Sequence, residues 1–244
     1  RWRAADEGRR RDLSCLRDRS SRPLDKVYAV ANGRVAFVNP HSLICARLLD
    51  RHATAALGAD FLRERLETAL ALRERLFDKP FYRLVYGDSD GLPGLIVDRY
   101  GEVLVLQVGT AGMERLLEEL LAVLVDLLAP AGILLRNDTA VREMEQLPLY
   151  TRVAHGEVPE LVELEENRVH FRVAAAGGQK TGWFYDHRMN RARLAPYVKG
   201  KRVLDLFSYI GGWGVQAAAF GASEVMCVDA SGFALDGVER NAAL

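Results

Sequence analysis

The stretch Val-Leu-Asp-Leu-Phe-Ser-Tyr-Ile-Gly-Gly occupies residues 203–212 and decides the fold class. Its apolar first half, with Arg202, predicts a buried strand that delivers Asp205 just ahead of a tight turn. Glycines at 211 and 212 let a ligand approach the backbone of that turn. A helix over 215–220, a second strand over 224–228 and a helix starting at Ser231 are expected to follow. This order predicts one βαβ unit of a parallel sheet.

The second acidic residue of this unit is Asp229, which ends the second predicted strand 18 residues after Gly211. An acid at this position accepts hydrogen bonds from the two ribose hydroxyls of a nucleotide-like cofactor. Two carboxylates also suit a cofactor that carries an amino group and a sulfonium charge but no phosphate. The structural alternative is a plain βα turn, with Asp229 beginning a capping turn with Ser231. Both acids together, at this spacing, favour cofactor binding.

Two other nucleotide-binding motifs fit the sequence less well. The dinucleotide fingerprint is G-x-G-x-x-G, whereas this turn reads Phe-Ser-Tyr-Ile-Gly-Gly-Trp-Gly, with bulky side chains where pyrophosphate needs bare backbone. Residues 179–181, Gln-Lys-Thr, resemble the end of a P-loop. That loop requires glycine where Gln179 and Ala174 stand. NAD binding and ATP hydrolysis are therefore disfavoured.

Upstream of this unit, the sequence pattern predicts a hairpin over 161–173 that turns at Glu166-Asn167, then a helix over about 185–197. A small α+β unit is expected before it. An amphipathic helix over 60–77 leads into that unit. Residues 27–49 predict two short strands and a turn, and residues 1–26 are expected to be disordered or non-native. Within the α+β unit, strands are expected over 81–86, 94–99, 103–108 and 133–136, and a helix over 113–128.

The composition describes a soluble, cytoplasmic, globular protein. Of 244 residues, 49% are hydrophobic and 27% charged, and no apolar run approaches the roughly 20 residues that cross a bilayer. Cys15, Cys45 and Cys227 form no C-x-x-C pair, so no disulfide framework or metal site is expected, and each is interpreted as a small buried residue.

The formal net charge is zero, but the charges are unevenly distributed along the chain. Basic residues gather between 178 and 202, and this stretch is either a solvated helix face or a phosphate-contacting surface. Its members are Lys180, Arg188, Arg191, Arg193, Lys199, Lys201 and Arg202.

Several long motifs in one order resemble the large-subunit ribosomal RNA cytosine methyltransferases that carry a PUA domain. They are residues 178–188 with Asn190-Arg191, residues 204–212, and the central segments 82–88, 90–100 and 136–138. The resemblance covers roughly residues 34–244. It implies an α/β fold: an incomplete, Rossmann-like class I methyltransferase domain preceded by a small α+β domain and a PUA-barrel remnant. The implied boundaries are 27–52 for the PUA remnant, 53–155 for the central domain with its linker helix, and 156–244 for the methyltransferase part, with 1–26 outside.

The resemblance also implies a function, which is transfer of a methyl group from S-adenosylmethionine to carbon 5 of a cytosine in large-subunit ribosomal RNA. Ribosomal RNA is the implied partner, and a homodimer is a further expectation. Lys180 and Arg188 could equally contact RNA phosphates or pair with acids. The implied cofactor-binding residues are Asp205, Phe207, Ser208, Tyr209, Gly211 and Asp229, joined by Lys180, Thr181, Phe184, Asp186 and Arg188 from the preceding motif.

The sequence departs from the family at Ile210, where the family usually has a small hydroxyl residue. It also departs at Trp183 and Trp213, where the family usually has a different aromatic residue. It also stops at Leu244, before the Asp-Pro-Pro motif and before the cysteine that adds to cytosine carbon 6 to make carbon 5 nucleophilic. We therefore expect no catalytic residue, no metal and no activity in this fragment, and poor folding after about Gly200. A non-catalytic RNA-binding module is the alternative.

Overall fold

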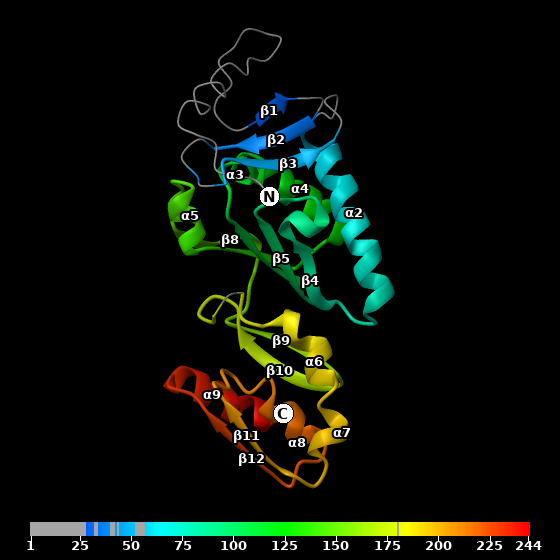
Figure 1. The fold of residues 1–244 in the computed structure, drawn as a ribbon, viewed down its shortest axis with the longest axis vertical. Coiled ribbons are helices and arrows are strands. Elements are labelled where there is room, and N and C mark those ends of the chain that lie inside the picture. Colours follow the sequence, from blue (N-terminus) through cyan, green and yellow to red (C-terminus); the bar gives the residue numbers. More distant parts are fainter. Residues whose placement is uncertain (1–27, 32–33, 40–41, 43, 52–56, 180) are drawn as a thin grey trace.

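The computed structural model describes residues 28–31, 34–39, 42, 44–51, 57–179 and 181–244. The prediction of disorder for residues 1–26 lies outside these residues, as does Lys180. Figure 1 shows the chain as an N-terminal sheet, a central α/β layer and a C-terminal unit, one below the other. Within the described residues, no helix is long and apolar enough to cross a membrane.

The N-terminal sheet has three antiparallel strands, β1 (Tyr28–Ala31), β2 (Arg34–Val38) and β3 (Ala46–Asp50), in the order β1-β2-β3. The expectation of two strands was therefore wrong. Strand β3 was missed because a single short apolar pair, Leu48 and Leu49, carries its signal. Phe37 fixes this sheet to the next layer, since a side chain at Gly112 would meet its ring at 2.3 Å.

The central sheet has five strands in the order β4-β5-β6-β7-β8: Phe81–Tyr86, Leu95–Tyr100, Val103–Val108, Gly132–Asn137 and Tyr150–Gly156. Only the β6–β7 pair is parallel.

The helices of the central layer lie between its strands in sequence. The short η2 helix (Gly87–Asp90) follows β4, and α5 (Ala140–Met144) precedes β8. The long helix α2 (Ala59–Leu76) packs on β4 and α4 (Leu117–Leu128), and Leu116 separates α4 from α3 (Ala111–Arg115), so the helix expected over 113–128 is two helices.

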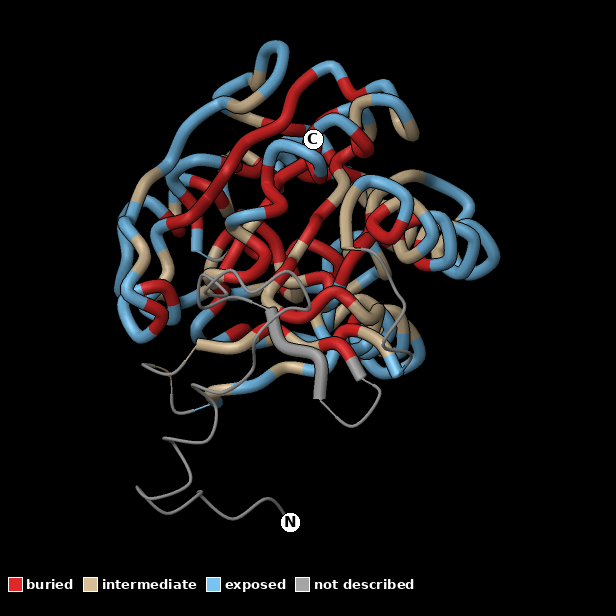
Figure 2. Tube along the Cα trace, turned by 90° about the horizontal axis from the view of Figure 1, so that it is seen from above, coloured by how far each residue is buried: buried red, intermediate tan, exposed pale blue. Residues whose placement is uncertain are grey.

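Both faces of the central sheet are buried, which gives the molecule two cores. Leu104 and Leu106 of β6 face α2 and α4, whereas Val103 and Val105 face the C-terminal unit. This alternation follows from the two-residue period of a strand. Figure 2 shows the buried residues gathered in the middle of the molecule.

The C-terminal unit (residues 161–244) begins with the hairpin β9 (Leu161–Glu166) and β10 (Val169–Ala174). Glu166 pairs with Val169, and Asn167 and Arg168 have φ values of 54° and 68°. Two successive positive φ angles are typical of a type I′ hairpin turn. The turn predicted at Glu166-Asn167 is thus confirmed.

A single helix over 185–197 was expected, and the structure contradicts it. The segment forms η3 (Tyr185–His187), α6 (Arg188–Ala192) and α7 (Ala195–Val198). Pro196 accounts for the second break, because proline cannot donate a backbone hydrogen bond and is tolerated only in a first helical turn.

The predicted βαβ unit is confirmed. Strands β11 (Arg202–Leu206) and β12 (Glu224–Val228) are parallel, α8 (Gly214–Ala219) connects them, and α9 (Gly232–Ala242) follows. Alternate side chains lie on an exposed face of this two-stranded sheet, where Leu204 and Met226 are 58% and 55% accessible. The side chains of β12 alternate between exposed and half-buried, and Cys227, expected to be a small buried residue, is half-buried.

Candidate functional site: the carboxyl ends of the two parallel strands

The turn after β11, residues 207–213, has an unusual backbone. Phe207 and Tyr209 have φ values of 60° and 49°, a left-handed conformation that non-glycine residues rarely adopt. The Phe207 ring is 91% exposed. Strained backbone of this kind concentrates at ligand sites, and ligands of open α/β sheets bind outside the carboxyl ends of the strands. The turn is therefore the first element of the candidate site.

Asp229 joins this turn to the end of β12. Its Oδ2 accepts a hydrogen bond from the Tyr209 amide at 2.8 Å, and its Oδ1 accepts one from the Ser231 amide at 2.9 Å. Ser231 in turn caps α9 by accepting from the Ala234 amide. The capping role considered from the sequence is thus present, and it leaves each carboxylate oxygen a second lone pair.

Asp205, the other acid of the motif, lies beneath the turn rather than on it. It is 8% exposed, and its Oδ2 accepts a hydrogen bond from the Gly214 amide at 2.9 Å, at the start of α8. Burial raises the pKa of this carboxyl above its ordinary value, although the Gly214 amide opposes the rise. Asp205 thus holds α8 in position from inside the unit.

The Tyr209 side chain connects the turn to the loop before η3. Its hydroxyl accepts a hydrogen bond from the Gln179 amide at 3.0 Å and donates one to the Gly182 carbonyl at 3.3 Å. A side chain at Gly178 would meet this hydroxyl at 2.5 Å. The Phe184 ring contacts the Tyr209 ring edge to face, at 5.7 Å between centroids. The loop over 177–182 is therefore fixed against the turn.

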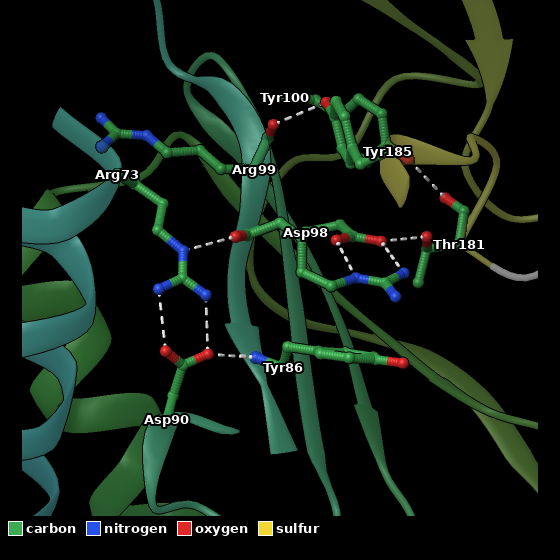
Figure 3. Close-up of polar contacts among 9 residues, drawn as sticks. Arg73, Tyr86, Asp90, Asp98, Arg99, Tyr100, Thr181 and Tyr185 are labelled. Atoms are coloured by element: carbon green, nitrogen blue, oxygen red, sulfur yellow. Dashed lines mark hydrogen bonds and ion pairs between the residues drawn. The ribbon is translucent and has the colours of Figure 1, made fainter. Parts of the chain in front are cut away.

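Thr181 and Arg188 face away from the turn. The Thr181 hydroxyl donates to the buried Asp98 carboxylate of β5, as Figure 3 shows. Arg188 donates to the Phe81 carbonyl at 2.7 Å and stacks on Phe77. Both contacts are with the central layer, so neither residue lines the turn. Asp186 is exposed beside His187, whose Nε2 lies 3.9 Å from its carboxylate.

A buried polar cluster in the same unit was missed from the sequence. Glu166 is fully buried and accepts hydrogen bonds from Arg191 at 2.5 and 3.0 Å, from Trp183 at 2.9 Å and from Gln216 at 2.9 Å. It ties the hairpin to α6 and α8. The members of this charge pair lie 25 residues apart and leave no local sequence pattern, so only the structure reveals the pair. Arg191, counted in the basic stretch, is thus an internal partner.

The Ser208 side chain supplies a test of fit for a polar cofactor. Its hydroxyl is buried, and among the described residues no hydrogen-bond partner reaches it. A buried polar atom without a partner costs free energy unless a ligand or water satisfies it. Phe207, with its exposed ring, precedes Ser208, and the Asp229 carboxylate accepts from the amide of Tyr209, which follows Ser208. The turn therefore suits a ligand with an aromatic ring and hydroxyl groups. No cluster of metal-ligating side chains occurs among the described residues.

Comparison with known proteins first defines a class. Residues 151–243 match the family of S-adenosylmethionine-dependent methyltransferases. A Streptococcus mutans S-adenosylmethionine-dependent methyltransferase has the same fold, with a TM-score of 0.73 and 23% identity over 92% of this chain and 61% of that one. Residues 151–243 thus match the S-adenosylmethionine-dependent methyltransferase family, and the chain has the α/β fold of a class I methyltransferase.

The particular relatives are ribosomal RNA methyltransferases. The chain is a homologue of Ribosomal RNA large subunit methyltransferase I, with 41% identity to the Aliivibrio fischeri protein over 208 residues, 84% of this chain and 52% of that protein. The Vibrio cholerae protein is 39% identical over 213 residues, 86% of this chain and 53% of its own. The chain thus spans about half the length of these curated relatives.

Proposed function

We propose that this chain forms the donor-binding part of an enzyme that transfers a methyl group from S-adenosylmethionine to carbon 5 of a cytosine in large-subunit ribosomal RNA. The observation that carries the proposal is the turn over 207–213, where Asp229 fixes the Tyr209 amide and Ser208 keeps a buried hydroxyl without a partner among the described residues. The names of the relatives support the ribosomal RNA substrate. A homodimer stays a prediction.

Each residue of the turn has a role in this proposal. The donor supplies an electrophilic methyl group on a sulfonium centre. Asp229 accepts hydrogen bonds from the ribose hydroxyls, and the Ser208 hydroxyl pairs with a polar group of the donor. Phe207 and the Tyr209–Phe184 pair present aromatic surface, which stacks on the adenine ring or attracts the cation. Asp205 positions the turn from below through Gly214.

We infer that the chain alone does not complete the transfer. The chemistry needs a thiolate that adds to cytosine carbon 6, and the reactive form of cysteine is the thiolate. Burial, with the nearby Asp205 charge, raises the pKa of the Cys227 thiol to about 11, so Cys227 is protonated at neutral pH. Cys45 directly precedes β3, and Figure 1 shows β3 far from the β11–β12 unit that carries the 207–213 turn. Cys15 lies outside the described residues.

The domain assignment follows the same proposal. Residues 27–52 correspond to the PUA remnant, 53–155 to the central domain and 156–244 to the methyltransferase part. In this arrangement the first two units face the RNA and the third holds the donor. The strands β1–β3 support the first assignment because a PUA domain is a β-barrel.

A non-catalytic RNA-binding module is less well supported than the sequence suggested. Three of the seven basic residues between 178 and 202 are engaged within the protein, since Arg188 and Arg191 make the contacts above and Arg202 pairs with Glu224. The salt dependence of binding separates the two functions. Phosphate binding weakens steeply with salt, whereas binding of a methyl donor changes little.

A thermal-shift measurement tests the cofactor class. S-adenosylmethionine is expected to raise the melting temperature, and NAD is expected to leave it unchanged, because only a ligand that binds the native state stabilises it. A shift with NAD and none with S-adenosylmethionine would overturn the proposal.

A further inference from the structure

A pocket of about 420 Å³ lies in the upper part of the molecule, where β3, the β4–η2 junction, β5, β6 and α5 meet. Figure 1 shows these elements well above the β11–β12 unit. No residue of 151–243, the segment that matches the methyltransferase family, lines it. Its volume falls within the range of about 300–1,000 Å³ that is typical of small-molecule pockets.

An exposed aromatic ring stands at the rim of this pocket. Tyr86 is 56% exposed, and its amide donates to the Asp90 carboxylate at 2.6 Å, a contact drawn in Figure 3. The Arg83 guanidinium lies 5.4 Å from the ring centroid and is itself held by two 2.9 Å hydrogen bonds to Asp98. The ring is therefore held in place by buried ion pairs while remaining open to solvent.

Two glycines allow the side chains of the pocket wall to pack closely. A side chain at Gly94 would meet Thr110 at 2.3 Å, and one at Gly109 would meet Val141 at 3.0 Å. Both glycines line the pocket. Glycine at these positions therefore lets Thr110 and Val141, which also line the pocket, pack closely against the backbone.

The charge of the lining argues against a phosphate as the ligand. Arg47 is the one cation among the described lining residues, and it faces the one carboxylate, Asp88, at 3.9 Å. The buried Arg47 Nε has no hydrogen-bond partner among the described residues. The lining also has uncharged polar side chains, which are those of Ser89, Gln107, Thr110 and Thr139, and apolar ones, which are those of Leu95, Ile96 and Val141. Neutral polar groups beside an aromatic ring suit a flat heterocycle with hydrogen-bonding edges.

We propose that this pocket receives an unpaired nucleobase of an RNA strand, at a site separate from the methyl-donor turn. The inference rests on the proposed RNA substrate and extends it to a second point of contact. Tyr86 stacks on the base, and Gln107 and Arg47 read its edge. A base within a duplex cannot reach the pocket, so single-stranded or looped RNA is selected.

Fluorescence anisotropy with a labelled single-stranded RNA, and with the blunt duplex of the same sequence, tests the proposal on the full chain. Base–aromatic stacking contributes enough that Tyr86→Ala should weaken single-strand binding by about 5- to 50-fold. Tyr86→Phe keeps the ring and should bind like the wild type. Ser89→Trp fills the exposed side of the pocket and should also weaken binding, whereas Thr68→Trp, on the exposed face of α2, should not.

The outcomes separate this proposal from the proposed function. Equal RNA binding by the wild type, Tyr86→Ala and Ser89→Trp would overturn the pocket and leave the methyl-donor assignment standing. Equal affinity for duplex and single strand would also overturn it. Titration of S-adenosylmethionine into the same variants should give unchanged affinity, because the pocket shares no residue with the donor turn. Loss of donor binding in the wild type would instead overturn the proposed function.

Discussion

Glu166 shows how one residue organises the C-terminal unit. Its carboxylate is fully buried and receives hydrogen bonds from the Arg191 guanidinium, the Trp183 indole and the Gln216 amide. The sequence placed Glu166 at a hairpin turn and Arg191 in a basic stretch, and nothing in either local pattern joins them. Asp205 and Asp229, in contrast, were recognisable because strand ends and glycine turns mark their positions. The sequence thus predicts residues at motif positions better than buried partners.

Glu166→Ala should lower the free energy of unfolding by about 3–5 kcal/mol, because it leaves the Arg191 charge buried without a counter-charge. Glu163→Ala, on the same strand, removes an exposed pair with Arg172 and should cost less than about 1 kcal/mol. Urea denaturation of both variants measures the difference. Equal losses would contradict the assignment of Glu166 as a buried ion-pair centre.

Asp205 should give the protein a distinct pH dependence. Burial raises the pKa of this carboxyl in the native state, so the native state holds its proton to higher pH than the unfolded state does. The contribution of Asp205 to stability is therefore fully present below the unfolded-state pKa of about 3.9 and falls as pH rises through the native-state pKa. Asp205→Asn should remove this fall. The free energy of unfolding of the wild type and of Asp205→Asn is measured as a function of pH. If the two curves run parallel, the pKa of Asp205 is not raised in the native state.

At the scale of elements, helices and strands with a strong hydrophobic periodicity were predicted correctly, and those with a weak one were not. Helix α2 and strands β4, β5, β6 and β7 match the expected ranges to within a residue or so. Strand β8 was missed because its side chains are mostly exposed and show no alternation. The helix expected over 185–197 is broken before α7, where Pro196 cannot donate the backbone hydrogen bond that a continuous helix would need.

The β11–β12 sheet should be less protected from hydrogen exchange than the central sheet. Its face with Leu204, Leu206, Met226 and Val228 is exposed, and two strands alone form a marginal sheet. Amide hydrogens of 202–206 and 224–228 should therefore exchange faster than those of β6, which is paired on both sides. Hydrogen exchange by mass spectrometry measures this. Equal protection of β11 and β6 would show that the small sheet is stable without further strands.

At the scale of the whole molecule, the central layer and the C-terminal unit form one packed body. Asp98 of β5 is fully buried and accepts hydrogen bonds from Arg83 and from Thr181 across the boundary. Arg136 of β7 donates to the carbonyls of Ala175 and Gly178 at 2.7 and 3.1 Å. The loop that contacts Tyr209 is thus held by the central layer. No sequence motif predicts this contact between the two parts.

Thr181→Val keeps the shape of the side chain and removes the hydroxyl that donates to Asp98. Hydrogen bonds to charged groups contribute about 1.5–3 kcal/mol, so the variant should lose stability of that order. Thr151→Val, at an exposed position of β8, should lose almost none. Chemical denaturation compares the two. If Thr181→Val unfolds with the same free energy as the wild type, the contact with Asp98 does not stabilise the boundary between the central layer and the C-terminal unit.

The central claim, that the 207–213 turn and Asp229 bind the methyl donor, is tested most directly by calorimetric titration of S-adenosylmethionine. The wild type and Asp236→Ala, an exposed acid on α9, should bind with equal affinity. Asp229→Ala should bind at least about tenfold more weakly, because ribose hydrogen bonds to a carboxylate are worth more than about 1.4 kcal/mol. Equal binding by all three proteins would contradict the claim.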